Sequence, residues 1–232
     1  LPPEGPASAA QLSRYDGVYL GNTSEKVIYL TFDDGPHPMY TAQILDILAQ
    51  YDAKATFFVV NTGYNMNKLL NAMVDGGHSI GIHSVTHDYA KIYASEEAFF
   101  NDLYKMQKII KDYTGVTTTL MRFPGGSSNT ISKNHCPGIM TQLTKAVKDQ
   151  GFQYFDWNVS SGDAGGTKTA DGVYNNVIQG LKNKKTAVVL QHDIQGFSVD
   201  AVERILIWGI QNGYSFQALT SSSPTCHHGV NN

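Results

Sequence analysis

The sequence has few or none of the features that mark several common classes of protein. No run of about eighteen apolar residues occurs, so no segment is predicted to cross a membrane. There is no basic run and the formal net charge is −3, which argues against a nucleic-acid partner because such partners require a basic patch. Neither a GxGxxG motif nor a P-loop is present, which disfavours nucleotide-binding folds.

Cysteine is also scarce, since Cys136 and Cys226 are the only two. Neither has the spacing of a metal or redox motif. The pair could form a disulfide in an oxidising compartment or remain as two thiols, and the sequence leaves both alternatives open. Residues 1–24 lack the basic and apolar regions of an intact signal peptide, so we expect a flexible lead-in there. One domain is then expected at 25–221, followed by a C-terminal tail at 222–232.

Apolar segments typical of buried strands alternate along the chain with amphipathic helical patterns. Strands are predicted at residues 26–32, 54–60, 78–84, 118–124, 152–159, 185–193 and 214–219. Helices are predicted at residues 40–51, 68–77, 95–115, 138–151, 172–183 and 198–213. This alternation predicts parallel strands joined by crossover helices, arranged either as a barrel or as an open sheet.

Chemically active side chains follow the predicted strands near the points where the strands end. They are Asp33, Asp34, His83, His87, Arg122, Asp163 and His192. In a barrel of parallel strands, the active site lies at the carboxyl ends of the strands. Scattered surface charges would not concentrate at these positions, so the sequence predicts that these side chains share one site.

The segment HSVTH places His83 and His87 four residues apart. On a helix this spacing would put two imidazoles on one face, where they could hold one metal ion, although two solvated polar residues would have the same spacing. The segment TFDDGP ends the first strand with Asp33 and Asp34, which could form a polar turn or supply a third ligand. Zinc suits a site of two histidines and one carboxylate best, with cobalt, nickel, manganese and iron as alternatives.

Three further residues have both a structural and a catalytic interpretation. Arg122 could hold a carboxylate in a fixed orientation or form a structural ion pair. His192 ends a hydrophobic strand and could be only a polar tip. An imidazole near a carboxylate such as Asp163 could instead act as a general acid, because the carboxylate raises its pKa and fixes its tautomer.

Taken in order, TFDDGP, HSVTH, RFPGG, SSGDA and LQH resemble the five motifs of the NodB-homology polysaccharide deacetylases, carbohydrate esterase family 4. The resemblance implies a distorted (β/α) barrel of about seven parallel strands, with residues 25–221 as the catalytic domain. It also implies metal-dependent removal of acetyl groups from an N-acetylated glycan polymer. Peptidoglycan N-acetylglucosamine is the expected substrate, with chitin oligomers, N-acetylmuramic acid and O-acetylated xylan as alternatives. An extracellular or cell-surface location and a monomeric state are expected with it.

The resemblance assigns roles to the residues of the first three motifs. Asp33 would be the general base that takes a proton from the attacking water. Asp34, His83 and His87 would be the metal ligands. Arg122 would orient and tune Asp33.

Roles in the remaining motifs follow in the same way. The N–H of Gly125 would help to stabilise the oxyanion, and His192, tuned by Asp163, would protonate the leaving amine. Substrate binding would fall to Leu190, Trp157, Phe123 and Pro124. Two departures concern the groove: Ala164 follows Asp163 where members often have Trp, and Gly125 stands where they often have an aromatic residue. The latter change is expected to open that side of the groove.

Other functions fit parts of the pattern. An O-acetyl xylan esterase or a small-molecule amide hydrolase could use the same scaffold, although some of those hydrolases have lost the metal motif that is intact here. An inactive carbohydrate-binding module would be expected to lack the base or a metal ligand, and none is missing. A glycosidase would need two carboxylates across a cleft and would leave the histidines unexplained. We interpret His37 as a bystander near the rim, and the remaining histidines (His78, His135, His227 and His228) as ordinary surface or packing residues.

Overall fold

The structure is a computed structural model that describes residues 26–231, so the predicted lead-in at 1–24 lies outside the described residues. The strands are β1 (Val27–Asp33), β2 (Ala55–Val60), β3 (Ser79–Ser84), β4 (Leu120–Met121), β5 (Gln153–Tyr154), β6 (Val159–Ser160), β7 (Thr186–His192) and β8 (Ser215–Phe216). The helices are α2 (Tyr40–Gln50), α3 (Met66–Asp75), α4 (Tyr89–Ile92), α5 (Glu96–Thr114), α6 (Ile139–Asp149), α7 (Ala170–Leu181) and α8 (Gly196–Gln211), with a short 3-10 turn η1 (Ser132–Asn134).

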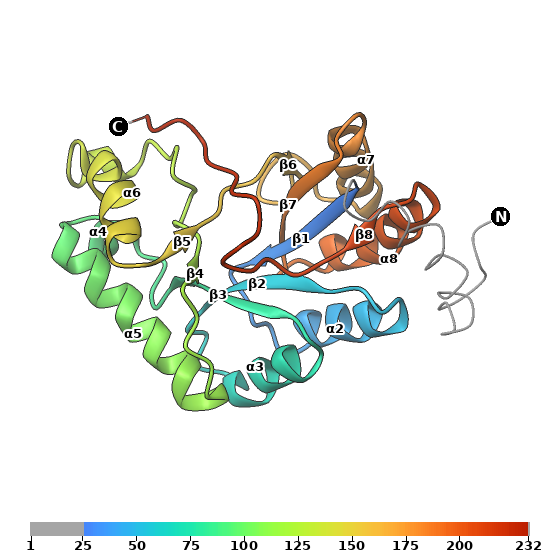
Figure 1. Ribbon diagram of the computed structural model, residues 1–232, viewed down its shortest axis with the longest axis horizontal. Helices are drawn as coiled ribbons and strands as arrows, with labels where there is room; N and C mark the ends of the chain where they lie inside the picture. Colours follow the sequence, from blue (N-terminus) through green and yellow to red (C-terminus); the bar gives the residue numbers. More distant parts are fainter. Residues whose placement is uncertain (1–25, 232) are drawn as a thin grey trace.

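The strands form one parallel sheet whose path runs β5-β4-β3-β2-β1-β7-β6, with β8 added beside β1. Figure 1 shows this sheet at the centre of the molecule, with the longer helices around it. The seven-stranded path makes a curled half-barrel, which confirms the predicted distorted (β/α) barrel.

The strand predicted at residues 152–159 is the one clear error in the assignment of elements. Its two ends belong to different edges of the sheet, because β5 pairs with β4 whereas β6 pairs with β7. The Phe155 N–H donates to the carbonyl of Met121 at 3.0 Å, and the Asn158 N–H donates to that of Val188 at 3.1 Å. Residues 155–158 therefore bridge the open side of the half-barrel instead of continuing one strand.

Two apolar layers hold the fold together. The larger core lies between the sheet and the helices and takes Ile28, Leu30 and Phe32 from β1. The opposite face of β1 contributes Val27 and Tyr29 to a smaller inner cluster. Successive residues of a strand point to opposite faces, so β1 is buried on both sides, as expected for the centre of a parallel sheet.

The C-terminal segment covers the inner cluster. Leu219 belongs to that cluster and Cys226 packs against it. In Figure 1 the red trace runs from β8 across the sheet toward β5 and ends near α6. The His227 ring stacks on Tyr154 of β5 with centroids 3.8 Å apart. The predicted tail thus contacts the half-barrel through Cys226 and His227.

Helix boundaries follow their capping residues. The Ser95 hydroxyl accepts a hydrogen bond from the Ala98 N–H at 3.1 Å and starts α5, and Gly115 ends it with a left-handed φ of 76°. His37, interpreted as a bystander, has a local role: its Nδ1 accepts from the Tyr40 N–H at 3.1 Å at the start of α2.

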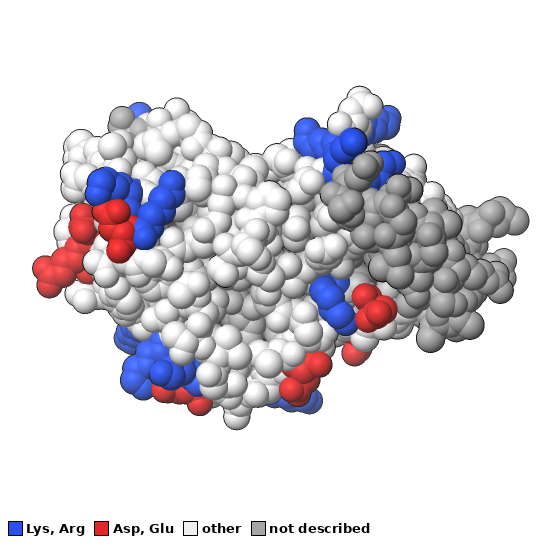
Figure 2. Space-filling model, viewed as in Figure 1, with Lys and Arg blue, Asp and Glu red and all other residues white. Residues whose placement is uncertain are grey.

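Three surface and composition features complete the description. Cys136 and Cys226 are both free thiols, so the structure contains no bridge between them. Within residues 26–231, no helix has the length and apolar character that a bilayer crossing requires. Figure 2 shows charged side chains in small groups around an uncharged centre, which fits a chain with only 16% charged residues.

Candidate active site

The predicted site residues meet where β1 and β7 end. These strands are parallel neighbours, and Asp33 is the register partner of His192. Asp33 is the last residue of β1, His192 is the last of β7, and His83 lies near the end of β3. The prediction that these side chains share the carboxyl edge of the sheet is confirmed by this geometry.

Asp34, His83 and His87 form a compact cluster. One ligand atom from each residue lies within 4.8 Å of the others. The Asp34 Oδ1 atom is 3.4 Å from the Nε2 atoms of both histidines. This oxygen is buried and has no hydrogen-bond partner among the described residues. A buried carboxylate oxygen without a donor is costly, so a cation between these three atoms would satisfy it.

The spacing of four residues suggested that His83 and His87 share one face of a helix, but the two histidines do not lie on a helix. His83 belongs to β3, and His87 follows in the turn after it with a left-handed φ of 51°. Asp34 also has a left-handed φ, 75°. Such conformations cost about 1–3 kcal/mol each in residues other than glycine and are typical of functional sites. The turns bring the side chains together.

The tautomer of His83 suits metal binding. Its Nδ1 lies 2.8 Å from the carbonyl oxygen of Arg122, which can only accept, so Nδ1 carries the proton and Nε2 is free to be a ligand. Burial opposes a charge on His83, but the Asp33 and Asp34 carboxylates outweigh it and raise its pKa. Burial likewise opposes ionisation of Asp34, yet His83 and other neighbouring imidazoles lower its pKa. These shifts favour a positive charge on His83 beside an ionised Asp34, whereas burial and the charge of His83 lower the pKa of His87.

Asp33 is held by a fully buried arginine. Arg122 Nη1 donates to Asp33 Oδ1 at 2.8 Å and to the Thr31 hydroxyl at 2.7 Å. Its Nε and Nη2 donate to the carbonyl oxygens of Phe155 and Asp156 at 2.8 and 2.9 Å. These bonds leave the guanidinium little freedom, so it holds the Asp33 carboxylate in one orientation.

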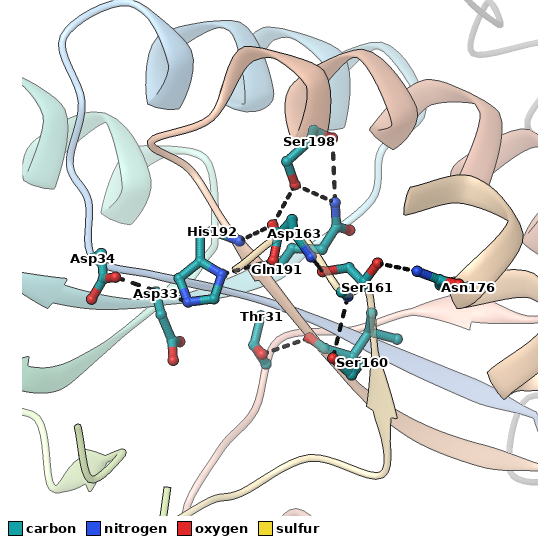
Figure 3. Close-up of polar contacts among 12 residues, drawn as sticks. Thr31, Asp33, Asp34, Ser160, Ser161, Asp163, Asn176, Gln191, His192 and Ser198 are labelled. Carbon is teal, nitrogen blue, oxygen red and sulfur yellow. Dashed lines mark hydrogen bonds and ion pairs between the residues drawn. The ribbon is translucent and has the colours of Figure 1, made fainter. Parts of the chain in front are cut away.

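On the other side of the cluster, His192 is held by a carboxylate (Figure 3). Its Nδ1 lies 2.8 Å from Asp163 Oδ1, and its backbone N–H donates to Asp163 Oδ2 at 2.7 Å. The Ser198 hydroxyl also donates to Oδ2, at 2.7 Å. Burial opposes the charged imidazole, but Asp163, Asp33 and Asp34 together raise the pKa of His192 to about 9. His192 is therefore protonated at neutral pH and can donate a proton from Nε2.

The loop after Arg122 is tied down from several sides. Tyr93, directly after α4, donates its hydroxyl to the carbonyl of Pro124 at 2.8 Å. The buried carboxylate of Asp156 accepts from the Ser127 N–H at 2.8 Å and from the His228 N–H at 2.8 Å. Gly125, between these anchors, is exposed and has a φ of 78°. Its N–H belongs to a rigid loop, as an oxyanion donor requires.

Gly125 does not open its side of the groove as we expected. A Cβ built on Gly125 would lie 2.7 Å from the Tyr89 hydroxyl oxygen and 3.0 Å from the Cβ of Asn129. The space next to this glycine is therefore already filled, mainly by the tyrosine at the start of α4.

The residues predicted to bind substrate are placed very differently. Trp157 is partly exposed in the bridging segment, and Leu190 of β7 is nearly buried. Phe123 requires a correction, because its ring is fully buried and packs on Phe99 and Tyr154 in the core. Pro124 is also buried, so the RFPGG segment offers its backbone and Gly125 to the site instead of those two side chains.

Sequence reasoning missed several supporting residues. Asp156 and Tyr93 anchor the loop that carries Gly125, and Ser198 hydrogen-bonds Asp163. Asp193 is fully buried, accepts from the Thr41 hydroxyl, and fills the space that a side chain on Gly35 would need. Of these residues, only Asp193 could have been noticed in the sequence. It follows the last residue of an apolar strand, and a buried carboxylate at such a position is unusual.

Comparison with known proteins agrees with this geometry. Residues 20–137 match the sequence profile described as polysaccharide deacetylase, which is about half of the chain. The chain belongs to the polysaccharide deacetylase family. Membership and fold make it a hydrolase that removes acetyl groups.

Relatives in this family include a peptidoglycan-N-acetylglucosamine deacetylase of Bacillus cereus, 36% identical over 223 residues, covering 91% of this chain and 74% of the relative. The catalytic domain of a peptidoglycan N-acetylglucosamine deacetylase from Eubacterium rectale has a similar structure, with a TM-score of 0.87 and 54% identity over 90% of this chain and 94% of that one. A Bacillus cereus polysaccharide deacetylase gives a TM-score of 0.75 at 36% identity, covering 89% and 96% of the two chains.

Proposed function

We propose that this polysaccharide deacetylase hydrolyses the acetamido groups of N-acetylglucosamine units in peptidoglycan and releases acetate. The observation that carries the proposal is the pairing of Asp33 with His192 at the ends of two adjacent strands, beside the cluster of Asp34, His83 and His87. Several relatives are named for activity on this sugar of peptidoglycan, which supports the choice of substrate.

The cluster of Asp34, His83 and His87 fits a divalent metal ion, and zinc suits its two nitrogen donors and one oxygen donor best. When bound, the ion would supply Lewis-acid polarisation of the acetyl carbonyl and of the attacking water. The unpartnered Asp34 Oδ1 is the feature of the structure that such an ion would satisfy.

The chain's own residues would divide the proton transfers. Asp33, oriented by its hydrogen bond from Arg122, takes a proton from the water that attacks the acetyl carbon. The Gly125 N–H donates to the oxygen that becomes negative, a contact typically worth about 3–4 kcal/mol in the transition state. Protonated His192 gives its Nε2 proton to the nitrogen of the leaving amine, and acetate and a free amino sugar result.

The protonated state of His192 favours an amide over an ester as substrate. An amine cannot leave without a proton, whereas an alkoxide leaving group needs acid assistance much less. The carboxylates that raise the pKa of His192 to about 9 therefore support N-deacetylation over O-deacetylation. All of these residues come from one chain, so a monomer would suffice, and a peptidoglycan substrate would place the enzyme outside the cell or at its surface.

Acetate release tests the proposal directly. Purified enzyme is incubated with chitooligosaccharides, peptidoglycan and acetylated xylan, before and after removal of metal by a chelator and after addition of zinc. We expect acetate from the two N-acetylated substrates, loss of release on chelation, and recovery with zinc. Absence of acetate from every N-acetylated substrate at full metal occupancy would refute the function, and release only from xylan would favour the esterase.

A further inference from the structure

Tyr89 is the residue at this site whose position the proposed reaction leaves unexplained. It begins the short helix α4, directly after the turn that carries His87. Its ring meets the His87 ring edge-on, with centroids 5.4 Å apart at 85°. The left-handed backbone of His87 turns the chain back at this point, and the tyrosine is thereby placed beside a candidate metal ligand.

The hydroxyl of Tyr89 lies where a side chain at position 125 would begin. Position 125 belongs to the loop whose N–H would bind the oxyanion. It lies 2.7 Å from the Cβ that Gly125 lacks. Tyr93, the residue that follows the end of α4, anchors this arrangement, because its hydroxyl donates to the Pro124 carbonyl. The two tyrosine rings also contact one another, with centroids 5.7 Å apart. Through these two tyrosines, the segment that begins with α4 contacts both the turn of His87 and the loop of Gly125.

The two tyrosines differ in what their hydroxyl groups do. Tyr93 is fully buried and its hydroxyl is satisfied. Tyr89 is only half-buried, and among the described residues no acceptor bonds its hydroxyl. A phenol carries one donor and can also accept, so this hydroxyl is available to a ligand that binds at the site. Its position at the site indicates a partner in the substrate.

The direction of the Gly125 N–H indicates which part of the substrate this is. At a φ of 78°, covalent geometry turns the N–H to roughly the opposite side of the residue from Cβ. The acetyl oxygen bound by that N–H would thus lie away from the Tyr89 hydroxyl. The sugar ring next to the acetyl group is left as the partner, since its hydroxyl groups can both accept and donate.

We propose that the Tyr89 hydroxyl hydrogen-bonds a hydroxyl group of the sugar that carries the acetamide, and so replaces a binding side chain at position 125. The contact forms in the ground state and persists in the transition state, because the sugar hydroxyl does not react. It is therefore a determinant of substrate binding and not of the chemical step. This inference rests on the proposed function for the identity of the substrate.

The test compares Tyr89→Phe with the unchanged enzyme on chitotetraose, with acetate release as the readout. Loss of one hydrogen bond made equally in both states should raise KM about five- to tenfold and leave kcat within about twofold. Tyr104→Phe is the matched control, because the Tyr104 hydroxyl bonds Gln150 on the outer surface between α5 and the end of α6. This control should leave both constants unchanged.

Binding supplies a readout that does not depend on turnover. Calorimetric titration of chitotetraose into Asp33→Asn and into Asp33→Asn/Tyr89→Phe should show the same five- to tenfold weakening. An unchanged Kd and KM would overturn the inference, and so would a fall in kcat at constant KM. If the unchanged enzyme releases no acetate, the proposed function fails, but the two titrations still decide whether Tyr89 binds the sugar.

Discussion

The two sides of the site use the same kind of ion pair with the charges reversed. Next to β4, a buried arginine donates to a carboxylate, Asp33, and holds it in one orientation as the proposed proton acceptor. Next to β6, a buried carboxylate, Asp163, holds an imidazole, His192, and favours its protonated, donating form. Asp33 and His192 are register partners, so the proposed proton acceptor and proton donor lie side by side at the same edge of the sheet.

The largest expected effect comes from removing the base itself. Asp33→Asn keeps the shape of the side chain but cannot accept a proton, so kcat should fall by about 10³-fold or more. Metal content, measured by atomic emission, should stay near that of the unchanged enzyme, because Asp34, His83 and His87 remain. The exposed Asp46→Asn on α2 is the matched control.

His87→Ala should give the opposite pattern, with loss of metal as the primary defect. If Asp33→Asn lost its metal while His87→Ala kept it, the assignment of base and ligand would be reversed.

Removing the arginine that holds the base should affect stability as well as activity. Arg122→Met leaves Asp33 buried without its partner, and breaking such a pair typically lowers the free energy of unfolding by about 3–5 kcal/mol. Denaturant unfolding measures this loss. Arg204→Met, which breaks the exposed pair with Asp171, should cost no more than about 1 kcal/mol. Equal losses in the two variants would show that Arg122 is not a buried anchor.

The smallest expected effect concerns the C-terminal segment on the arginine side. His228 Nε2 lies 2.6 Å from the carbonyl oxygen of Trp157, and Nδ1 lies 3.0 Å from the Ser128 hydroxyl. His228→Ala should raise KM a few-fold because Trp157 and the Gly125 loop lose support. The fall of kcat/KM at high pH, the alkaline limb of the pH profile, is set by His192 and should stay in place. The exposed His135→Ala is the control, and a shift of that limb in His228→Ala would contradict the separation of the two sides.

The sequence was sufficient for the arrangement of the fold and for the chemical residues, because both depend on local patterns. Alternating strands and helices predicted parallel strands with crossover helices, and the family resemblance implied the distorted barrel. Asp33 and His192 could be placed because each directly ends an apolar strand. The roles carried over from the family motifs remain predictions that the variants above test.

The remaining features depend on contacts between distant segments, which no local pattern encodes. The run 152–159 has the composition of one strand, yet pairing with β4 and β7 divides it in two. Phe123 stands in a site motif but packs in the core, and His228 is remote in sequence from Asp156, to whose carboxylate its N–H donates. Gly125 looks like an opening until the position of Tyr89 is known.

In the proposed reaction, Arg122 supports Asp33 as the base and Asp163 supports His192 as the acid. The pH dependence of kcat/KM in the unchanged enzyme and in Asp163→Asn tests this assignment most directly. His192 has a pKa raised above its ordinary value, so the acid is present at lower pH and is lost as pH rises through about 9. Removing the charge of Asp163 lowers that pKa, so the alkaline limb should move down by about one pH unit or more while the acidic limb stays. Asp171→Asn, an exposed carboxylate on α7, should move neither limb. An unmoved alkaline limb in Asp163→Asn, or a shift of the acidic limb instead, would contradict the assignment of His192 as the acid and Asp33 as the base.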